Sequence, residues 1–537
     1  MLALDGALDL VRLKGQVPDA TANKLRRLSQ WLATVMKSGF LLQAAADAFG
    51  LDVVHLNAES HVYQIGQGAR GFHFEQASNE RDALTGAIVA RNKRLTTLTL
   101  RKFGFPVPRG ELVSDERQAG AAITRIGFPC VVKPVSMDKG TGVATSLKTE
   151  AQVIAAVAHA KRLSSKAVLI ENHIEGVDHR MMVAGGELLW AYRKDPASLY
   201  GDGKATVAQL IERENRNRAE IRSGSEVYRY PIITDDAFEH FLTGRYGIGS
   251  ETVLPAGTGI EVAPQANIAR GGLLKDVTGS VHPDNRMLAI RTARLLRLHT
   301  AGIDFMTPDI SRSWKEIDCA IIEINGAPGI SGMGDASLLL RTSFPNRLTG
   351  RIPTVVVIGD MDFRTRSAEV VRAAFIAHGL CLRVADYGVG SGKADGQHFP
   401  LAQTVETLLL DPEAEAALIA CGPGEVERWG LPVRHCPLLI VQGDAPPEWL
   451  ARRAGAVLAA GVSRAEIENA VTSLARRYVD PAEGGPRPVL EPLGPYRENE
   501  YRLRVWRVRS APKAWFWGQV GLKAPNPDGL ITQDDLL

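Results

Sequence analysis

Three oxygen-bearing side chains at the ends of two short apolar segments could bind a metal ion. In residues 301–329, AGIDFMTPDISRSWKEIDCAIIEINGAPG, Asp304 ends the first segment, and Glu323 and Asn325 end the second. Because Glu323 and Asn325 lie two residues apart, a strand would place both side chains on one face. Such a set suits Mg²⁺, which prefers carboxylate and carbonyl oxygens together with phosphate. A half-buried hairpin with polar ends explains these residues equally well, so their surroundings have to decide.

A lysine at the end of a predicted strand marks a second candidate site. The strand reads CVVKP, contains Lys133 and is followed by a glycine-containing loop over residues 135–142. Free N–H groups beside a lysine suit a phosphate, although the loop lacks the GxxxxGK[ST] pattern of a P-loop. Farther along, AVLIENHIEGVDHRMMV predicts a strand, a linker and a second strand. In this segment Glu171, the backbone near Ile174 and Asp178 could hydrogen-bond an adenine amine and a ribose.

Length and composition exclude several classes of protein. A chain of 537 residues is too long for one core, and about two to four domains are expected. Its 63 Lys and Arg nearly balance 60 Asp and Glu, which argues against a dedicated nucleic-acid binder. No apolar run is long enough for a membrane span, and the first residues lack a signal-peptide layout. The five cysteines are scattered without CxxC spacing, which is typical of a reducing compartment and favours the cytoplasm.

The order of predicted elements divides the chain into four parts. These are a small N-terminal α/β domain (residues 1–85), a large central domain (86–347), a second α/β domain (350–480) and a tail of uncertain fold (481–537). Apolar periodicity predicts one helix over residues 83–103, which carries Lys93 and ends at Gly104. A β-rich run at residues 355–358, a turn and a helix from about Ser367 have the layout of a nucleotide-binding βα unit.

Taken together, these motifs resemble an ATP-grasp ligase, and most closely the ATP-grasp part of the cyanophycin synthetases. The resemblance covers roughly residues 78–345. It rests on FPCVVKP, ENHIEGVDHR, LYGDGKATVAQLIE, ARGGLLKDVTGSVHP, AGIDFMTPDIS and EINGAPG. The segment that begins at Gly350 resembles the Mur ligase-like domain that follows in that family. The implied fold class is α/β multidomain, with an ATP-grasp fold followed by a degenerate Mur ligase-like Rossmann-type α/β domain.

The resemblance also implies a role for each candidate residue. Contacts to the nucleotide phosphates are implied for Lys93 and Lys133. A loop that folds over the phosphates is implied for Ser136, Gly140, Thr141 and Gly142. Adenine and ribose contacts are implied for Glu171, Ile174 and Asp178. The implied Mg²⁺ ligands are Asp304, Glu323 and Asn325. Contacts to the transferred phosphoryl group are implied for Arg193, Asn267 and Arg270, and the acceptor side of the site for His179 and Arg180.

The implied activity is ATP- and Mg²⁺-dependent amide formation through an acyl phosphate. The substrates would be amino acids, β-aspartyl-arginine-type dipeptides or a growing peptide, with no nucleic acid and no membrane as partner, and self-association into a homo-oligomer is expected. The Mur ligase-like part departs from its family, because Phe363 stands at the lysine position of the expected GTNGKTT loop and Ala420 at that of a metal-binding glutamate. We therefore expect one active centre, as in the truncated cyanophycin synthetases.

Two other functions stay open at the level of sequence. One is a catalytically silent nucleotide-binding scaffold, for which the loss of the second site is the motive. Retention of every expected Mg²⁺ ligand argues against it. The other keeps the ligase chemistry but assigns it to a natural-product or protein-tail substrate.

Overall fold

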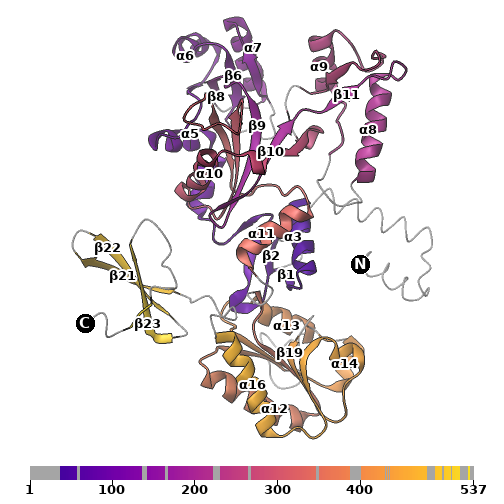
Figure 1. The fold of residues 1–537 in the computed structure, drawn as a ribbon, viewed down its shortest axis with the longest axis vertical. Helices are drawn as coiled ribbons and strands as arrows, with labels where there is room; N and C mark the ends of the chain where they lie inside the picture. The colour runs from indigo at the N-terminus through magenta and orange to yellow at the C-terminus, as the bar shows by residue number, and fades with distance from the viewer. Residues whose placement is uncertain are drawn as a thin grey trace. The chain divides into compact units, whose positions relative to one another are not determined.

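The computed structural model of the chain contains two compact units. It describes residues 37–56, 61–135, 142–163, 167–221, 230–263, 266, 268–345, 350–386, 401–429, 431, 433, 436–479, 490–498, 501–508, 511–519 and 530–532. The first unit combines Met1–Ala45 with Phe74–Ser343, and the second combines Ala46–His73 with Phe344–Leu537. Several sheets with helices on them confirm the expected α/β multidomain class (Figure 1). Among the described residues, no helix is long and apolar enough to cross a membrane.

One antiparallel sheet of the first unit has the order β5-β8-β6-β7. Its strands are Gly110–Val113, Val168–Asn172, Cys130–Pro134 and Ala144–Leu147. Helices α6 (Ala119–Ile126) and α7 (Glu150–Leu163) pack on one face, over a core that includes Cys130, Val132 and Ile170 (Figure 1). Because side chains alternate along a strand, Lys133 and Glu171 lie on the opposite face.

A second antiparallel sheet of the same unit has the order β13-β10-β9-β14-β15. Its strands are Leu273–Asp276, Glu187–Asp195, Val177–Ala184, Thr300–Thr307 and Ala320–Asn325. Helix α10 (Pro283–Leu295) covers the apolar face, where Met181, Val183, Ile303 and Phe305 are buried. The alternate residues of these strands form the opposite, polar face of the sheet.

Two helices replace the single helix expected over residues 83–103. Helix α4 (Leu84–Arg91) ends before Asn92, and α5 (Lys93–Lys102) begins directly after it. The helix breaks because the Asn92 backbone is extended and its side chain accepts a hydrogen bond from the N–H of Leu95, which caps α5. Asparagine is a preferred residue at this capping position.

An inserted subdomain lies between β10 and β13 in the chain. It contains strands β11 (Ser198–Tyr200) and β12 (Gly259–Glu261) and helices α8 (Val207–Ile221) and α9 (Asp236–Tyr246). The subdomain has a core of its own, which includes Leu199, Leu210, Phe238, Leu242 and Ile260. Helix α11 (Met333–Ser343) ends the first unit.

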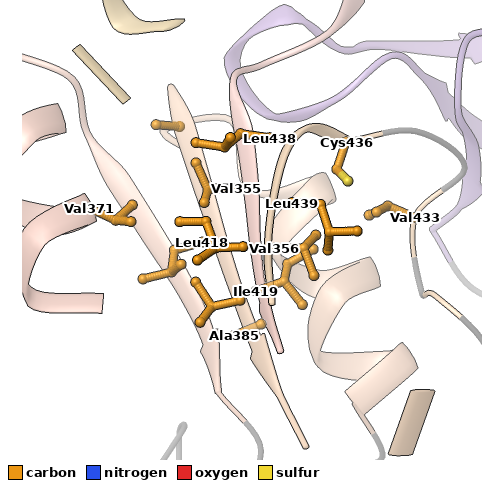
Figure 2. Close-up of a cluster of buried hydrophobic side chains, with 14 of the residues drawn as sticks. Val355, Val356, Val371, Ala385, Leu418, Ile419, Val433, Cys436, Leu438 and Leu439 are labelled. Carbon is orange, nitrogen blue, oxygen red and sulfur yellow. The ribbon is translucent and has the colours of Figure 1, made fainter. Parts of the chain in front are cut away.

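The second unit is built on a parallel sheet of order β17-β18-β16-β19-β20. Its strands are Leu382–Asp386, Ala416–Cys421, Thr354–Ile358, Cys436–Val441 and Ala454–Leu458. The helices are α12 (Met361–Ala377), α13 (Leu401–Leu410), α14 (Pro423–Trp429), α15 (Glu448–Ala451) and α16 (Arg464–Val479). Val355, Leu418 and Leu439 belong to its buried core (Figure 2). Helix α12 begins at Met361, before the expected Ser367, because Asp360 caps it.

Residues 46–73 form part of the second unit although they lie between the two segments of the first unit in the chain. The amide of Gln64 donates a hydrogen bond of 2.6 Å to the Leu409 carbonyl. The Arg70 guanidinium lies 3.8 Å from the centre of the Tyr478 ring.

Strands β1 (Val53–His55), β2 (Val62–Ile65), β3 (Phe72–Glu75) and β4 (Ser78–Asn79) follow one another in a separate sheet. An antiparallel sheet of Leu490–Glu498, Tyr501–Val508, Ala511–Gln519 and Leu530–Thr532 lies near the C-terminus.

Candidate active site

Charged side chains from several strands meet on the polar face of the second sheet. Asp304 of β14 lies opposite Arg180 of β9 on one side and opposite Glu323 of β15 on the other. Strand alternation adds Asp178 and Lys194 to this face. We call these five residues the charged cluster, and the sheet geometry explains why residues so far apart in sequence come together.

Asp304 is bound by two cations. Arg180 contacts it through both Nε and Nη2, the second at 3.2 Å from Oδ2, and Lys194 Nζ lies 3.0 Å from the same oxygen. The Asp304 side chain is 7% exposed and that of Lys194 9% exposed. Burial of charge at this depth is tolerated only because each charge has a partner of opposite sign.

Lys194 also contacts Asp178, at 2.7 Å between Nζ and Oδ2. Burial and the charge of Asp304 raise the pKa of Asp178 to about 6, although Lys194 opposes the shift. Burial also disfavours the charged form of Asp304, but Arg180 and Lys194 outweigh it and lower the pKa of Asp304 below its ordinary value. Asp304 is therefore held as a carboxylate, and its two cations are held close to it.

A glycine makes room for the guanidinium of Arg180. A Cβ added at Gly302 would lie 3.1 Å from Arg180 Nη1 and 2.8 Å from Pro328 Cβ. Gly302 precedes Asp304 by two residues and belongs to the same face of β14. The absence of a side chain at this position leaves space for Arg180 beside Asp304.

A second buried ion pair lies on the first sheet. Lys133 Nζ is 2.5 Å from Glu171 Oε2, and these side chains are 12% and 5% exposed. Glu171 also lines a small, open hollow together with Arg94, Thr97, Leu98, Arg101, Gly110 and Leu169. Ile174, in the linker after β8, is buried.

The remaining predicted residues lie apart from the charged cluster or outside the described residues. Arg193 pairs with Asp195 at 2.7 Å, and Arg270 pairs with Asp235 at 2.7 Å. The buried ring of His179 shares a hydrogen bond of 2.8 Å with the Val177 carbonyl, and burial lowers its pKa, so the ring is neutral near pH 7. Two further residues begin or precede elements of the first unit, namely Lys93 at the start of α5 and Gly142 before β7. Those outside the described residues are Ser136, Gly140, Thr141 and Asn267.

The sequence motifs indicate a role for Arg193 and none for its neighbour Lys194. The available signal was the alternation of β10, which places Tyr192 and Lys194 on one face and Arg193 on the other. A bulge between Leu188 and Trp190 shifts the phase of that alternation. For this reason the apolar residues at the start of β10 do not indicate whether Arg193 or Lys194 faces the acids.

The charged cluster and Asn325 fit a hard divalent cation. Glu323 and Asn325 lie on the face of β15 that carries Asp304, and they supply carboxylate and amide oxygens. The amide nitrogen of Asn325 is buried without a hydrogen-bond partner, as is Oδ1 of Asp178. Among the described residues, no three His, Cys, Asp or Glu side chains group as a metal site. Asp304 and Glu323 offer two carboxylates, and Asn325 offers one amide oxygen beside them.

Comparison with protein families assigns a class to part of the first unit. Residues 87–199 match a family model described as an ATP-grasp domain. This range includes the Lys133–Glu171 pair and, from the charged cluster, Asp178, Arg180 and Lys194. The chain therefore contains an ATP-grasp domain, and the expected resemblance to this class is confirmed.

Beyond that domain, the chain is similar to cyanophycin synthetases. It is 29% identical over 404 residues to that of Nostoc sp., covering 72% of this chain and 44% of the relative. It is also 29% identical over 414 residues to that of Geminocystis herdmanii, covering 74% and 46%. A glutathione biosynthesis bifunctional protein GshAB of Streptococcus agalactiae is 27% identical over 268 residues, covering 48% and 35%. The chain thus spans less than half the length of these relatives.

Two solved structures give weaker similarity. The bifunctional glutathione synthetase from Pasteurella multocida matches with a TM-score of 0.43 and 19% identity, over 57% of this chain and 44% of the other. The D-alanine–D-alanine ligase from Bacillus anthracis matches with a TM-score of 0.31 and 14% identity, over 50% and 70%.

Proposed function

We propose that the chain is an ATP- and Mg²⁺-dependent carboxylate–amine ligase that forms an amide through an acyl phosphate. The observation that carries the proposal is the charged cluster, which assembles acids and cations from strands β9, β10, β14 and β15. The match of residues 87–199 to an ATP-grasp domain supports it. The names of the relatives, cyanophycin synthetase and glutathione biosynthesis protein, support a synthetic reaction of this kind.

The proposed reaction has two steps. A carboxylate oxygen of the first substrate attacks the γ-phosphorus of ATP, the bond to the β-phosphate oxygen breaks, and ADP leaves. The amine of the second substrate then attacks the acyl carbon and loses a proton, and inorganic phosphate leaves with one oxygen of the original carboxylate. Phosphoryl transfer needs little covalent help from a protein, so positioning and charge neutralisation supply most of the rate.

The residues of the charged cluster have the charges that these steps need. Arg180 and Lys194 are buried cations beside Asp304, and each can neutralise oxygens of the transferred phosphoryl group. Asp304, Glu323 and Asn325 would hold Mg²⁺, which screens the charge on the phosphate oxygens when it is bound. Lys133 and the hollow beside Glu171 would hold the nucleotide.

The substrates belong to this proposal as well. Amino acids, β-aspartyl-arginine-type dipeptides or a growing peptide would supply the carboxylate and the amine, as the similarity to cyanophycin synthetases suggests. A cytoplasmic location and a homo-oligomer remain expectations of the same proposal. The silent scaffold keeps one supporting observation, because the two cations that bind Asp304 would also stabilise a fold without turnover.

We further propose that the parallel-sheet unit lacks a working nucleotide site. At the start of α12, where a phosphate-binding loop would lie, hydrogen bonds within the protein occupy both carboxylate oxygens of Asp360. Asp360 accepts a hydrogen bond of 2.8 Å from the Phe363 N–H, and Gln442 donates one of 2.7 Å to the other Asp360 oxygen. The Phe363 side chain packs against the core instead of supplying a cation. A carboxylate at this helix terminus would repel phosphate.

An assay of ADP release tests the proposed activity. Purified chain with ATP and Mg²⁺ is offered pairs drawn from Asp, Arg, Lys, Glu and β-aspartyl dipeptides. We expect ADP only when a carboxylate and an amine substrate are both present, and we expect Lys133→Ala and Glu323→Ala to abolish it. Full ADP release by both variants would show that the site assignment is wrong. Tight ATP binding without turnover on the whole panel would favour the silent scaffold.

A further inference from the structure

Both carboxylate oxygens of Asp304 carry a cation of the protein itself. Arg180 contacts each oxygen, and Lys194 adds a second contact to Oδ2 at 3.0 Å. A metal ion that binds Asp304 would therefore compete with these three contacts, which leave about one of the carboxylate's four lone-pair positions open. Asp304 is a metal ligand in the function proposed above, so the following inference rests on that assignment.

Of the two cations, Lys194 is the one that a metal can displace. Arg180 forms a two-pronged contact with Asp304, and its guanidinium fits over Gly302, so moving it would break several contacts at once. Lys194 makes one contact to Asp304 and keeps another partner, Asp178, at 2.7 Å. The lysine side chain is also a flexible stem with a compact charge, unlike the planar guanidinium.

We propose that Lys194 is an internal counter-ion that occupies the position of the metal at Asp304 and yields it when Mg²⁺ binds. In this role Lys194 is a positioning residue. It keeps Asp304 ionised and ordered, and it weakens metal binding until ATP supplies further ligands for the ion and a new partner for the lysine.

The charges of the cluster explain why the lysine matters. Three acids, Asp178, Asp304 and Glu323, face two cations, so the cluster carries a net charge of about −1 when all are ionised. Removal of the lysine charge brings that value to about −2, and a divalent ion is attracted more strongly by the more negative site. A purely structural lysine would have the opposite effect, because its loss would disorder the ligands.

Binding of Mn²⁺ alone, without nucleotide, tests this role. Mn²⁺ prefers the same hard oxygen ligands as Mg²⁺, and its free fraction is measured by electron paramagnetic resonance at pH 8. We expect Lys194→Met to bind Mn²⁺ about tenfold more tightly than the wild type, and Lys194→Arg, which keeps the charge, to bind it as weakly as the wild type. Unchanged or weaker binding by Lys194→Met overturns the proposal.

A matched control removes a lysine elsewhere in the first unit. Lys315 pairs with Asp284 at 3.2 Å, and its side chain is 60% exposed. Lys315→Met should leave Mn²⁺ affinity unchanged, because its charge is not part of the cluster. An equal gain in affinity in this variant would attribute the effect to overall charge and would overturn the role of Lys194.

A measurement on the wild type keeps the proposal testable if Lys194→Met fails to fold. Acetic anhydride labels accessible lysine amines, and mass spectrometry reports the extent at each residue. Labelling of Lys194 should rise about fivefold at a concentration of Mg²⁺ that saturates the site, since the amine leaves Asp304, and unchanged labelling at saturation contradicts the proposal. Neither measurement depends on turnover, so failure of the ligase assay and failure of this inference are separate results.

Discussion

The ion pair between Lys133 and Glu171 gives a prediction whose size follows from the structure. The two charged atoms lie 2.5 Å apart, and the side chains are 12% and 5% exposed. Removing one partner from a pair buried to this degree leaves an uncompensated charge, which costs about 3–5 kcal/mol. We therefore expect Lys133→Met to destabilise the first unit by that amount. For a unit of this size the loss lowers its melting temperature by about 5–8 °C.

Calorimetry on a set of matched variants measures this effect. Glu171→Gln in the background of Lys133→Met removes the orphaned charge, so we expect the double variant to recover more than half of the lost stability. The comparison of the two single variants with the double variant isolates the interaction itself. A melting temperature for Lys133→Met within about 2 °C of the wild type, or no recovery in the double variant, would refute the reasoning from burial.

Four further predictions follow from individual contacts. Gly302→Ala places a Cβ 3.1 Å from Arg180 Nη1, and displacement of that guanidinium should lower kcat for ADP release about tenfold. Glu323→Ala should lower ADP release at least about a hundredfold, with the circular dichroism spectrum unchanged. Asp360→Ala removes the cap of α12 and should cost about 1 kcal/mol in urea unfolding, yet leave ADP release as in the wild type. Burial raises the pKa of Cys436 to about 12, so its thiol should resist iodoacetamide at pH 8 until the chain unfolds, as mass spectrometry can show.

The parts of the site that were predictable from the sequence depend on local patterns. Glu323 and Asn325 share a face because they are two residues apart on one strand, and the strand is present as β15. The separate segments that contain Lys133 and Glu171 each predict a contact with the nucleotide. Their ion pair could not be predicted, because it depends on the antiparallel pairing of β6 with β8.

The parts that were not predictable depend on contacts between distant residues. The partners of Asp304 come from β9 and β10, and the bulge after Leu188 conceals which basic residue of β10 faces inward. The inclusion of residues 46–73 in the second unit rests on contacts such as that of Gln64 with Leu409. No local pattern in the sequence indicates such pairings. The roles of Arg193 and Arg270 stay predictions, and each has an acidic partner nearby.

The most direct test of the central claim follows the oxygen atoms of the carboxylate. A carboxylate substrate labelled with ¹⁸O is incubated with ATP, Mg²⁺ and an amine substrate that supports ADP release, and the inorganic phosphate is analysed by mass spectrometry. An acyl phosphate requires that one labelled oxygen appear in the phosphate for each amide formed. Phosphate without ¹⁸O, at a rate equal to that of ADP release, would contradict the proposed chemistry at the charged cluster.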